Sequence, residues 1–163
     1  MKVWLRMIAV ALVVVTMSAS VRADQLATKK TLTLAIAKQV AAASEAEAAK
    51  NKWMQVIAIL DDGGNLIYLE RMDDSQLGSL DVALEKAKSA LYFKRPTKVF
   101  QDQVAAGGNN VLKLPNAIAN EGGVPLMADG KVIGSIGISG ATAQQDGQVA
   151  AAAVDALTKI LAQ

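Results

Sequence analysis

Apolar residues recur at helical spacing in several stretches of the chain. In residues 27–50 they fall at Leu32, Ile36, Val40 and Ala43, with charged residues mostly elsewhere, which predicts an amphipathic helix. The same spacing returns over residues 79–93 and after residue 142, and a short helix is expected over residues 97–105. The sequence therefore predicts four helices.

Local signals place the ends of these helices. Ser79 is a suitable N-cap with Asp81 in the first turn, and the spacing of Thr142 and Gln145 is that of a capping box. Pro96 disfavours the helical conformation at the residue before it, so the second helix should end near Phe93.

Two other stretches are typical of β-hairpins. The apolar runs 55–60 and 66–71 flank a turn dense in aspartate, glycine and asparagine. The stretch 122–140 repeats this pattern around Asp129-Gly130, a dipeptide that supplies the positive φ angles of a tight turn. Glycines at positions 134, 137 and 140 indicate that another backbone or a ligand comes close to its second strand. The order helix, hairpin, helices, hairpin, helix predicts an α+β fold with a mainly antiparallel sheet.

The first 23 residues have the pattern of a secretory signal peptide. Lys2 and Arg6 accompany an apolar run over residues 7–15, and Val21-Arg22-Ala23 offers small residues to a signal peptidase. We expect cleavage after Ala23, a single domain over residues 24–163 and a periplasmic or secreted location. A retained N-terminal anchor is the alternative, and no other segment has the roughly 20 apolar residues of a membrane helix.

Charge and composition narrow the chemistry. Cleavage after Ala23 would leave 14 of the 17 basic residues against 15 acidic ones, which argues against nucleic acid or an anionic membrane as a partner. The chain has no histidine and no cysteine. This excludes disulfides, thiol catalysis, histidine acid/base catalysis and the usual zinc and copper sites.

Several motifs in order resemble the GlcG/HbpS family across nearly the whole predicted mature chain. They are Arg71-Met72-Asp73, then Ser79, Ala83, Lys86-Ala87, Ala90, Phe93, Pro96-Thr97, residues 122–126, residues 134–140 and Gln145-Asp146. The resemblance implies a profilin-like or PAS-like antiparallel sheet of about five strands packed by helices, and a homo-oligomer. It also implies heme binding in exported members, some of which work beside a membrane sensor. Other members of the family are associated with glycolate metabolism, which makes a dehydrogenase a second candidate partner. Asp74 departs from the glycine usual at that position, and the lack of histidine excludes a histidine-ligated heme.

Two basic residues are candidates for ligand binding. The Arg71 guanidinium could pair with a carboxylate or a heme propionate, or could instead pair with Asp73 or Asp81 and fix the start of the helix. Lys86 could be partly buried and face a ligand, or its stem could lie along the core while its amine reaches water. The resemblance, rather than any chemistry of its own, raises Lys86 as a candidate.

A cluster at the break between two helices could line a site for a flat apolar ligand. It comprises Tyr92, Phe93 and Thr97, of which Phe93 could instead be a core residue and Thr97 an N-cap. Other side chains able to bind iron are Tyr68, Met54, Met72 and Met127, although such residues usually serve packing. The paired aspartates at 61–62 and 73–74 fit turns better than a metal site, so the metal ligand stays unknown.

Three functions follow from these features. The first is an exported heme-binding protein that acts as a carrier, buffer or sensor accessory and is not a classical enzyme. The second is an enzyme of the same fold acting on a hydroxy acid or related metabolite, with Arg71 holding a carboxylate and Lys86 as acid/base. The third is a structural oligomerisation module.

Overall fold

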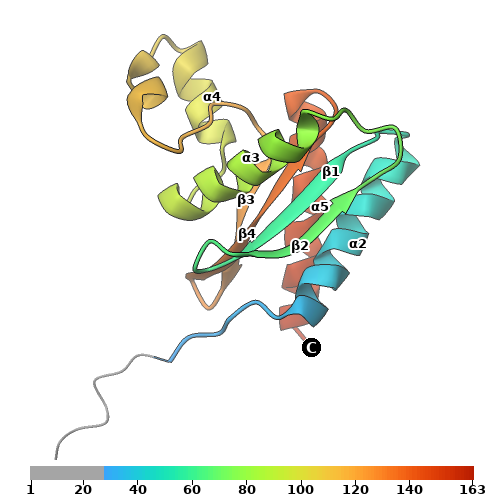
Figure 1. Cartoon of the computed structure of the whole chain (residues 1–163). Helices are drawn as coiled ribbons and strands as arrows, with labels where there is room; N and C mark the ends of the chain where they lie inside the picture. The colour runs from blue at the N-terminus through green and yellow to red at the C-terminus, as the bar shows by residue number, and fades with distance from the viewer. Residues whose placement is uncertain (1–27) are drawn as a thin grey trace, which may run out of the picture.

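The computed structural model describes residues 28–163, so the predicted signal peptide lies outside the described part. The helices and strands follow the predicted order (Figure 1). They are α2 (Leu34–Lys50), β1 (Val56–Asp61), β2 (Leu66–Arg71), α3 (Ser79–Phe93), α4 (Lys98–Ala105), the 3-10 helix η3 (Asn109–Lys113), β3 (Gly123–Ala128), β4 (Lys131–Ser139) and α5 (Ala143–Leu161). Among residues 28–163, no helix has both the length and the apolar character needed to cross a membrane.

Both predicted hairpins are confirmed, and they join into one antiparallel sheet. The strand order is β2-β1-β4-β3, so β1 and β4 are the central pair. Asp129 and Gly130 have φ angles of 50° and 71°, the two consecutive positive values of a type I′ turn. The α+β class is therefore confirmed, but the expected number of about five strands is wrong for the described residues, which form four. Residues 109–122, between α4 and β3, form η3 and an irregular segment instead of another strand.

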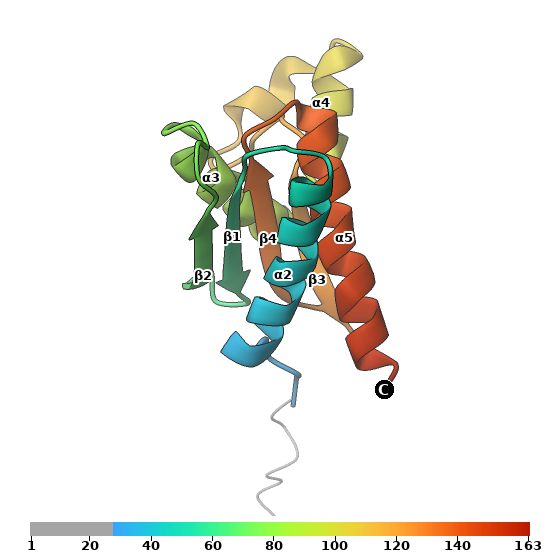
Figure 2. The ribbon, with the colours of Figure 1, turned by 90° about the vertical axis from the view of Figure 1, so that its right-hand side faces the viewer.

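Helices cover the sheet on both faces. Figures 1 and 2 show α2 and α5 side by side on one face and α3 on the other. The α4 and η3 segment projects beyond α3 at one end of the molecule. Strand alternation sends successive residues to opposite faces, so each central strand supplies two different packing surfaces.

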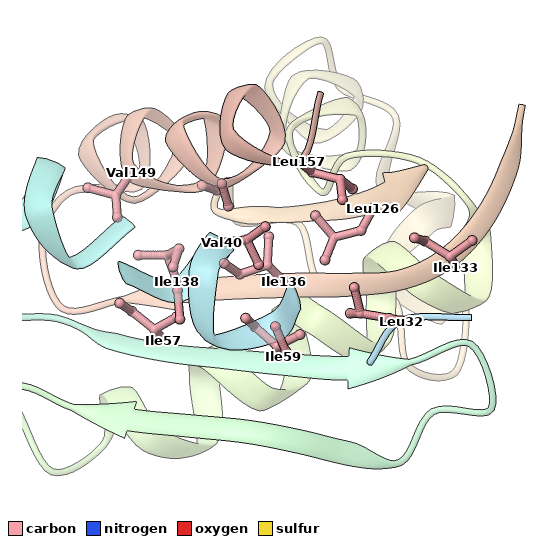
Figure 3. Close-up of a cluster of buried hydrophobic side chains, with 14 of the residues drawn as sticks. Leu32, Val40, Ile57, Ile59, Leu126, Ile133, Ile136, Ile138, Val149 and Leu157 are labelled. Carbon is pink, nitrogen blue, oxygen red and sulfur yellow. The ribbon is translucent and has the colours of Figure 1, made fainter. Parts of the chain in front are cut away.

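The larger core lies between the sheet and the α2–α5 pair (Figure 3). Ile57 and Ile59 of β1 and Ile136 and Ile138 of β4 point into it, and all four are fully buried. Val40 of α2, together with Val149 and Leu157 of α5, closes this core from the helix side. Its aliphatic side chains explain the apolar runs seen in the sequence.

On the opposite face, small residues lie where α3 crosses the central strands. Glycine and alanine let α3 lie almost directly on the strands, with Ala83 and Ala87 of the helix facing Gly137 of β4. A Cβ atom at Gly137 would overlap the carbonyl oxygen of Ala83 and lie 2.6 Å from the backbone nitrogen of Ala87. The prediction of a close backbone approach is confirmed at all three glycines. The backbone of α3 approaches Gly137, whereas the carbonyl oxygens of Leu60 and Met54 approach Gly134 and Gly140.

The helix ends differ from the predictions in two places. The first helix begins at Leu34, where Thr33 accepts a hydrogen bond from the Ile36 amide, and not at residue 27. Gly78, rather than Ser79, is the N-cap of α3, and Ser79 is buried as its first residue. The prediction of Ser79 as N-cap used local sequence alone. In the folded chain Ser79 is buried, and the helix starts one residue earlier than that cap implied.

The capping box of the last helix is confirmed. The Thr142 hydroxyl accepts from the Gln145 amide, and the Gln145 side chain accepts from the Thr142 amide. This box fixes the direction in which the first turn of α5 enters the fold, and the next residue, Asp146, contacts Lys86 of α3.

Candidate functional site

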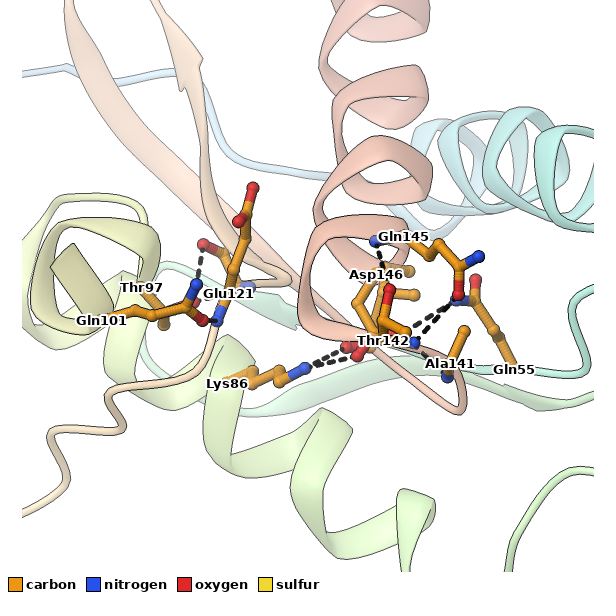
Figure 4. A network of polar contacts seen from close by, with 11 residues as sticks. Gln55, Lys86, Thr97, Gln101, Glu121, Ala141, Thr142, Gln145 and Asp146 are labelled. Carbon is orange, nitrogen blue, oxygen red and sulfur yellow. Dashed lines mark hydrogen bonds and ion pairs between the residues drawn. The ribbon is translucent and has the colours of Figure 1, made fainter. Parts of the chain in front are cut away.

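A buried ion pair between Lys86 and Asp146 links α3 to the first turn of α5 (Figure 4). The Lys86 ammonium nitrogen lies 2.6 Å from Oδ2 of Asp146 and also donates to the Ile138 carbonyl oxygen at 3.1 Å. The Lys86 side chain is fully buried, so the alternative in which its amine reaches water is wrong. The small residues beneath α3 leave the space through which this long side chain passes.

The second oxygen of Asp146 is also occupied. Oδ1 accepts from the Gln55 side-chain amide at 2.9 Å and from the Ala141 backbone amide at 3.1 Å. Burial lowers the pKa of Lys86 and raises the pKa of Asp146, while the contact between them opposes both shifts. Such a pair holds three segments together and is costly to break, because either charge alone would be buried without a partner.

The Gly122-Gly123 pair packs against α3 at Lys86. A Cβ atom at Gly122 would lie 2.9 Å from the Lys86 ammonium, and one at Gly123 would overlap the Lys86 carbonyl oxygen. The Thr97 hydroxyl is fully buried and accepts from the Gly123 amide at 3.0 Å, while the Thr97 amide donates to the Gly123 carbonyl at 2.9 Å. Thr97 thus occupies the N-cap position of α4 but directs its side chain to β3 instead of to its own helix.

We expect Thr97→Val to lower the free energy of unfolding by about 1–3 kcal/mol, because it leaves the buried Gly123 amide without an acceptor. Thr97→Ser, which keeps the hydroxyl, is the matched control and should lose less. Urea denaturation of the three proteins measures the difference. Equal stability of the valine and serine variants would contradict a structural role for the hydroxyl.

A second feature is a surface pocket of about 690 Å³ at the C-terminal end of α3, hereafter the turn pocket. The turns of both hairpins meet the end of α3 there, and the lining comprises Lys29, Asp62, Gly63, Leu91, Tyr92, Lys94, Met127, Gly130, Lys131 and Val132. Aliphatic, aromatic and thioether groups form part of its wall, and lysines lie around it. Its volume is within the range of sites for small ligands, about 300–1,000 Å³.

The five predicted site residues do not converge on one place. Lys86 and Thr97 meet at the Gly122-Gly123 pair, whereas Tyr92 lines the turn pocket. Phe93 packs edge-on against Phe100 with ring centroids 5.1 Å apart. Arg71, at the far end of β2 from the hairpin turn, donates to the Ser75 carbonyl oxygen at 3.1 Å. The alternative pairing of Arg71 with Asp73 or Asp81 is therefore not the contact formed.

The other possible iron ligands are also separated. Tyr68 donates to Glu70 at 2.6 Å, and this hydrogen bond raises the pKa of Tyr68 to about 12. Met72 packs against the larger core, Met54 is exposed, and Met127 lines the turn pocket with Tyr92. Among residues 28–163, no group of three or more acidic side chains is arranged to hold a metal ion.

Sequence reasoning did not single out Gln55 and Asp146 as partners of Lys86. Asp146 lies in the first turn of α5, where a negative charge interacts favourably with the helix dipole, so its presence has an ordinary local explanation. Gln55 interrupts an apolar region immediately before β1, and its Oε1 atom is buried without a hydrogen-bond partner among the described residues. A polar residue at the edge of an apolar run was the available signal, but only the fold brings it to Asp146.

The four-stranded antiparallel sheet with helices on both faces defines a class of α+β domain that is found in solved structures. ORFY of Klebsiella pneumoniae superposes with a TM-score of 0.76 at 34% identity, covering 83% of this chain and 96% of that one. The structure described as the PduOC:heme complex superposes with a TM-score of 0.71 at 30% identity, covering 78% and 95%.

Sequence comparison gives the family. The model described as "Haem degrading protein HbpS-like" matches residues 32–155. GlcG of Escherichia coli K12 is 41% identical over 112 residues, which are 69% of this chain and 84% of GlcG. The chain belongs to the HbpS-like family, as its motifs predicted.

Proposed function

We propose that this chain is an exported heme-binding protein that acts as a carrier, a buffer or an accessory to a sensor, and is not a classical enzyme. The turn pocket is the observation in this chain that carries the proposal. Family membership supports it, since the solved relative PduOC is described in complex with heme. The pattern of the first 23 residues supports export.

The residues of the turn pocket fit a heme group. A heme requires apolar contact for its ring, cations for its carboxylates and at least one ligand for its iron. Leu91 and Val132 provide apolar surface, and Lys94 and Lys131 provide ammonium groups. The chain has no histidine or cysteine, but the pocket contains two other side chains that can bind iron, Tyr92 and Met127.

A bound heme would supply a redox-active iron in a site that remains open to solvent. The chain would hold the ring against the end of α3 and the turn of the β3–β4 hairpin, which line the pocket together. Tyr92 and Met127 keep 52% and 41% of their surface exposed, so both are available to a ligand arriving from solution. An open site favours exchange of the ligand, as a carrier or buffer requires.

We expect hemin added to residues 24–163 to shift the Soret band and quench tryptophan fluorescence in a saturable way, reaching an end point at about one hemin per chain for a single pocket. The same chain in concentrated urea is the control, because it has an identical composition but no pocket. Absence of a saturable signal in the folded protein would contradict heme binding. Rapid transfer of the bound hemin to apomyoglobin would support a carrier or buffer over a permanent cofactor site.

The enzymatic alternative has less support from the geometry. Its proposed acid/base, Lys86, is buried against Asp146 and Ile138 and lies apart from the turn pocket, and Arg71 is at the end of another strand. Turnover of a hydroxy acid that is abolished in a folded Lys86 variant would favour the enzyme. The homo-oligomer and any sensor or dehydrogenase partner remain predictions from the family resemblance, and light scattering of the heme-free and heme-loaded protein tests the first of them.

A further inference from the structure

The end of α3 brings an aromatic hydroxyl into the turn pocket. Tyr92 is the second-last residue of the helix, and its ring lies against Gly64 in the β1–β2 turn. A Cβ atom placed at Gly64 would be 3.5 Å from both Cε1 and Oη of Tyr92, so the glycine provides a flat, open support for the ring. The Tyr92 side chain has no hydrogen-bond partner among residues 28–163, unlike Tyr68, whose hydroxyl is held by Glu70.

The next feature is a lysine in a conformation that favours glycine. Lys94 ends α3 with φ 51° and ψ 40°, the left-handed geometry usual for glycine at this position of a helix. The Lys94 side chain is exposed on the edge of the turn pocket, and replacing it with glycine would relieve the backbone conformation instead of straining it.

The lysines around the pocket differ in whether they already form an ion pair. Lys29 contacts Asp62 across the pocket edge, so its charge already has a partner. Lys94 and Lys131 form no ion pair within residues 28–163, and they approach the pocket from α3 and from the start of β4. Two ammonium groups without an acidic partner on separate elements suit a ligand that carries two carboxylates.

We propose that the turn pocket selects ferric heme, with the Tyr92 oxygen as the iron ligand and with Lys94 and Lys131 as partners of the two propionates. This rests on the proposed function and assigns its site. Tyr92 releases its phenolic proton to solvent as its oxygen binds the iron, and no electron is transferred in that step. A phenolate is a hard, anionic ligand, so it favours the ferric over the ferrous ion, whereas the Met127 thioether would favour the ferrous ion.

The first experiment separates iron ligation from ring and carboxylate binding. Hemin and metal-free protoporphyrin IX are titrated into the wild type and into Tyr92→Phe, with Tyr68→Phe as the matched control. We expect Tyr92→Phe to weaken hemin binding about tenfold, to remove the phenolate-to-iron charge-transfer band and to leave protoporphyrin binding unchanged. Tyr68→Phe should change neither the affinities nor the band. Met127→Leu should keep the band as well.

The second experiment tests the lysines with a substitution that relieves backbone strain, so that weaker porphyrin binding cannot be attributed to unfolding. Lys94→Gly removes the ammonium group but gives the left-handed position its preferred residue, so the variant should not melt earlier than the wild type. Lys52, with φ 59°, lies at the end of the molecule where β1 begins, away from the turn pocket, and Lys52→Gly is the matched control. We expect Lys94→Gly and Lys131→Gln each to weaken both hemin and protoporphyrin roughly three- to fivefold, and Lys52→Gly to weaken neither.

The outcomes distinguish this inference from the proposed function. If the wild type takes up no hemin, both are overturned. If hemin binds but Tyr92→Phe keeps the affinity and the spectrum, the chain binds heme elsewhere or through another ligand, and only the assignment of Tyr92 is overturned. If the lysine variants bind both porphyrins as tightly as the control does, the assignment of the carboxylate partners is overturned.

Discussion

Gly137→Ala is expected to lower the free energy of unfolding by about 3 kcal/mol or more, the upper end of the range for overpacked cores. The added Cβ would overlap the Ala83 carbonyl oxygen and lie 2.6 Å from the Ala87 backbone nitrogen. Neither atom belongs to a flexible side chain, so the whole of α3 would have to move away from the sheet. That movement would also separate Lys86 from Asp146, because Lys86 is on the displaced helix. Thermal and urea denaturation measure the loss, and poor recovery of soluble protein would be consistent with it.

Gly78→Ala is the matched control for this prediction. Gly78 immediately precedes α3 at φ −64°, and a Cβ atom there would meet nothing within 4 Å. The expected change in the free energy of unfolding is within about 1 kcal/mol. If Gly137→Ala were as stable as Gly78→Ala, the close contact between α3 and β4 could not be a determinant of this fold.

The second large effect concerns the buried ion pair. Asp146→Asn is expected to cost about 3–5 kcal/mol, because it leaves the Lys86 ammonium buried without its counter-charge. The asparagine oxygen could still accept from Gln55 and Ala141, so the loss reports mainly on the interaction with lysine. Lys86→Met is expected to cost a similar amount by leaving the carboxylate unpaired. The double variant should be less destabilised than the sum of the two by about 0.5–3 kcal/mol, since no charge remains uncompensated.

The Asp146→Asn variant should also have a distinctive pH dependence. Burial already lowers the pKa of Lys86 below its ordinary value of 10.5, and loss of the carboxylate removes the main influence that raises it. Between the folded pKa and 10.5 the unfolded chain binds more protons than the folded one, so stability rises with pH in that window. Urea denaturation at several pH values below 10.5 measures this slope. A slope that Lys86→Met/Asp146→Asn retains would show that another group causes it.

Local sequence signals predicted most of the secondary structure. The Asp129-Gly130 turn, the Thr142–Gln145 capping box and the end of α3 before Pro96 are each encoded within a few residues, and all are present. The errors concern the start of α2 and the cap of α3. At these positions tertiary packing competes with local propensity, which a pattern of spacing does not contain.

The candidate site was predicted less completely. The predicted cluster at the break between two helices included Tyr92, and the structure places Tyr92 in the turn pocket, but Lys94 and Lys131 have no sequence signal beyond their charge. They come from the end of a helix and the start of a strand that are separated by more than one other element. Lys86 was predicted as a ligand-binding candidate, yet its partner in the folded chain is Asp146, which is 60 positions away and could not be identified from the sequence.

The sequence by itself determined the order of helices and strands, the two hairpin turns and the absence of histidine and cysteine chemistry, because these depend on neighbouring residues or on composition. Only the tertiary structure decided which group approaches the β4 glycines, which acid neutralises Lys86 and where the unpartnered lysines gather. Each of those contacts joins segments that are distant in sequence. The contact of Lys86 with Asp146 depends in addition on how closely α3 can lie on the sheet, and therefore on the glycine at position 137.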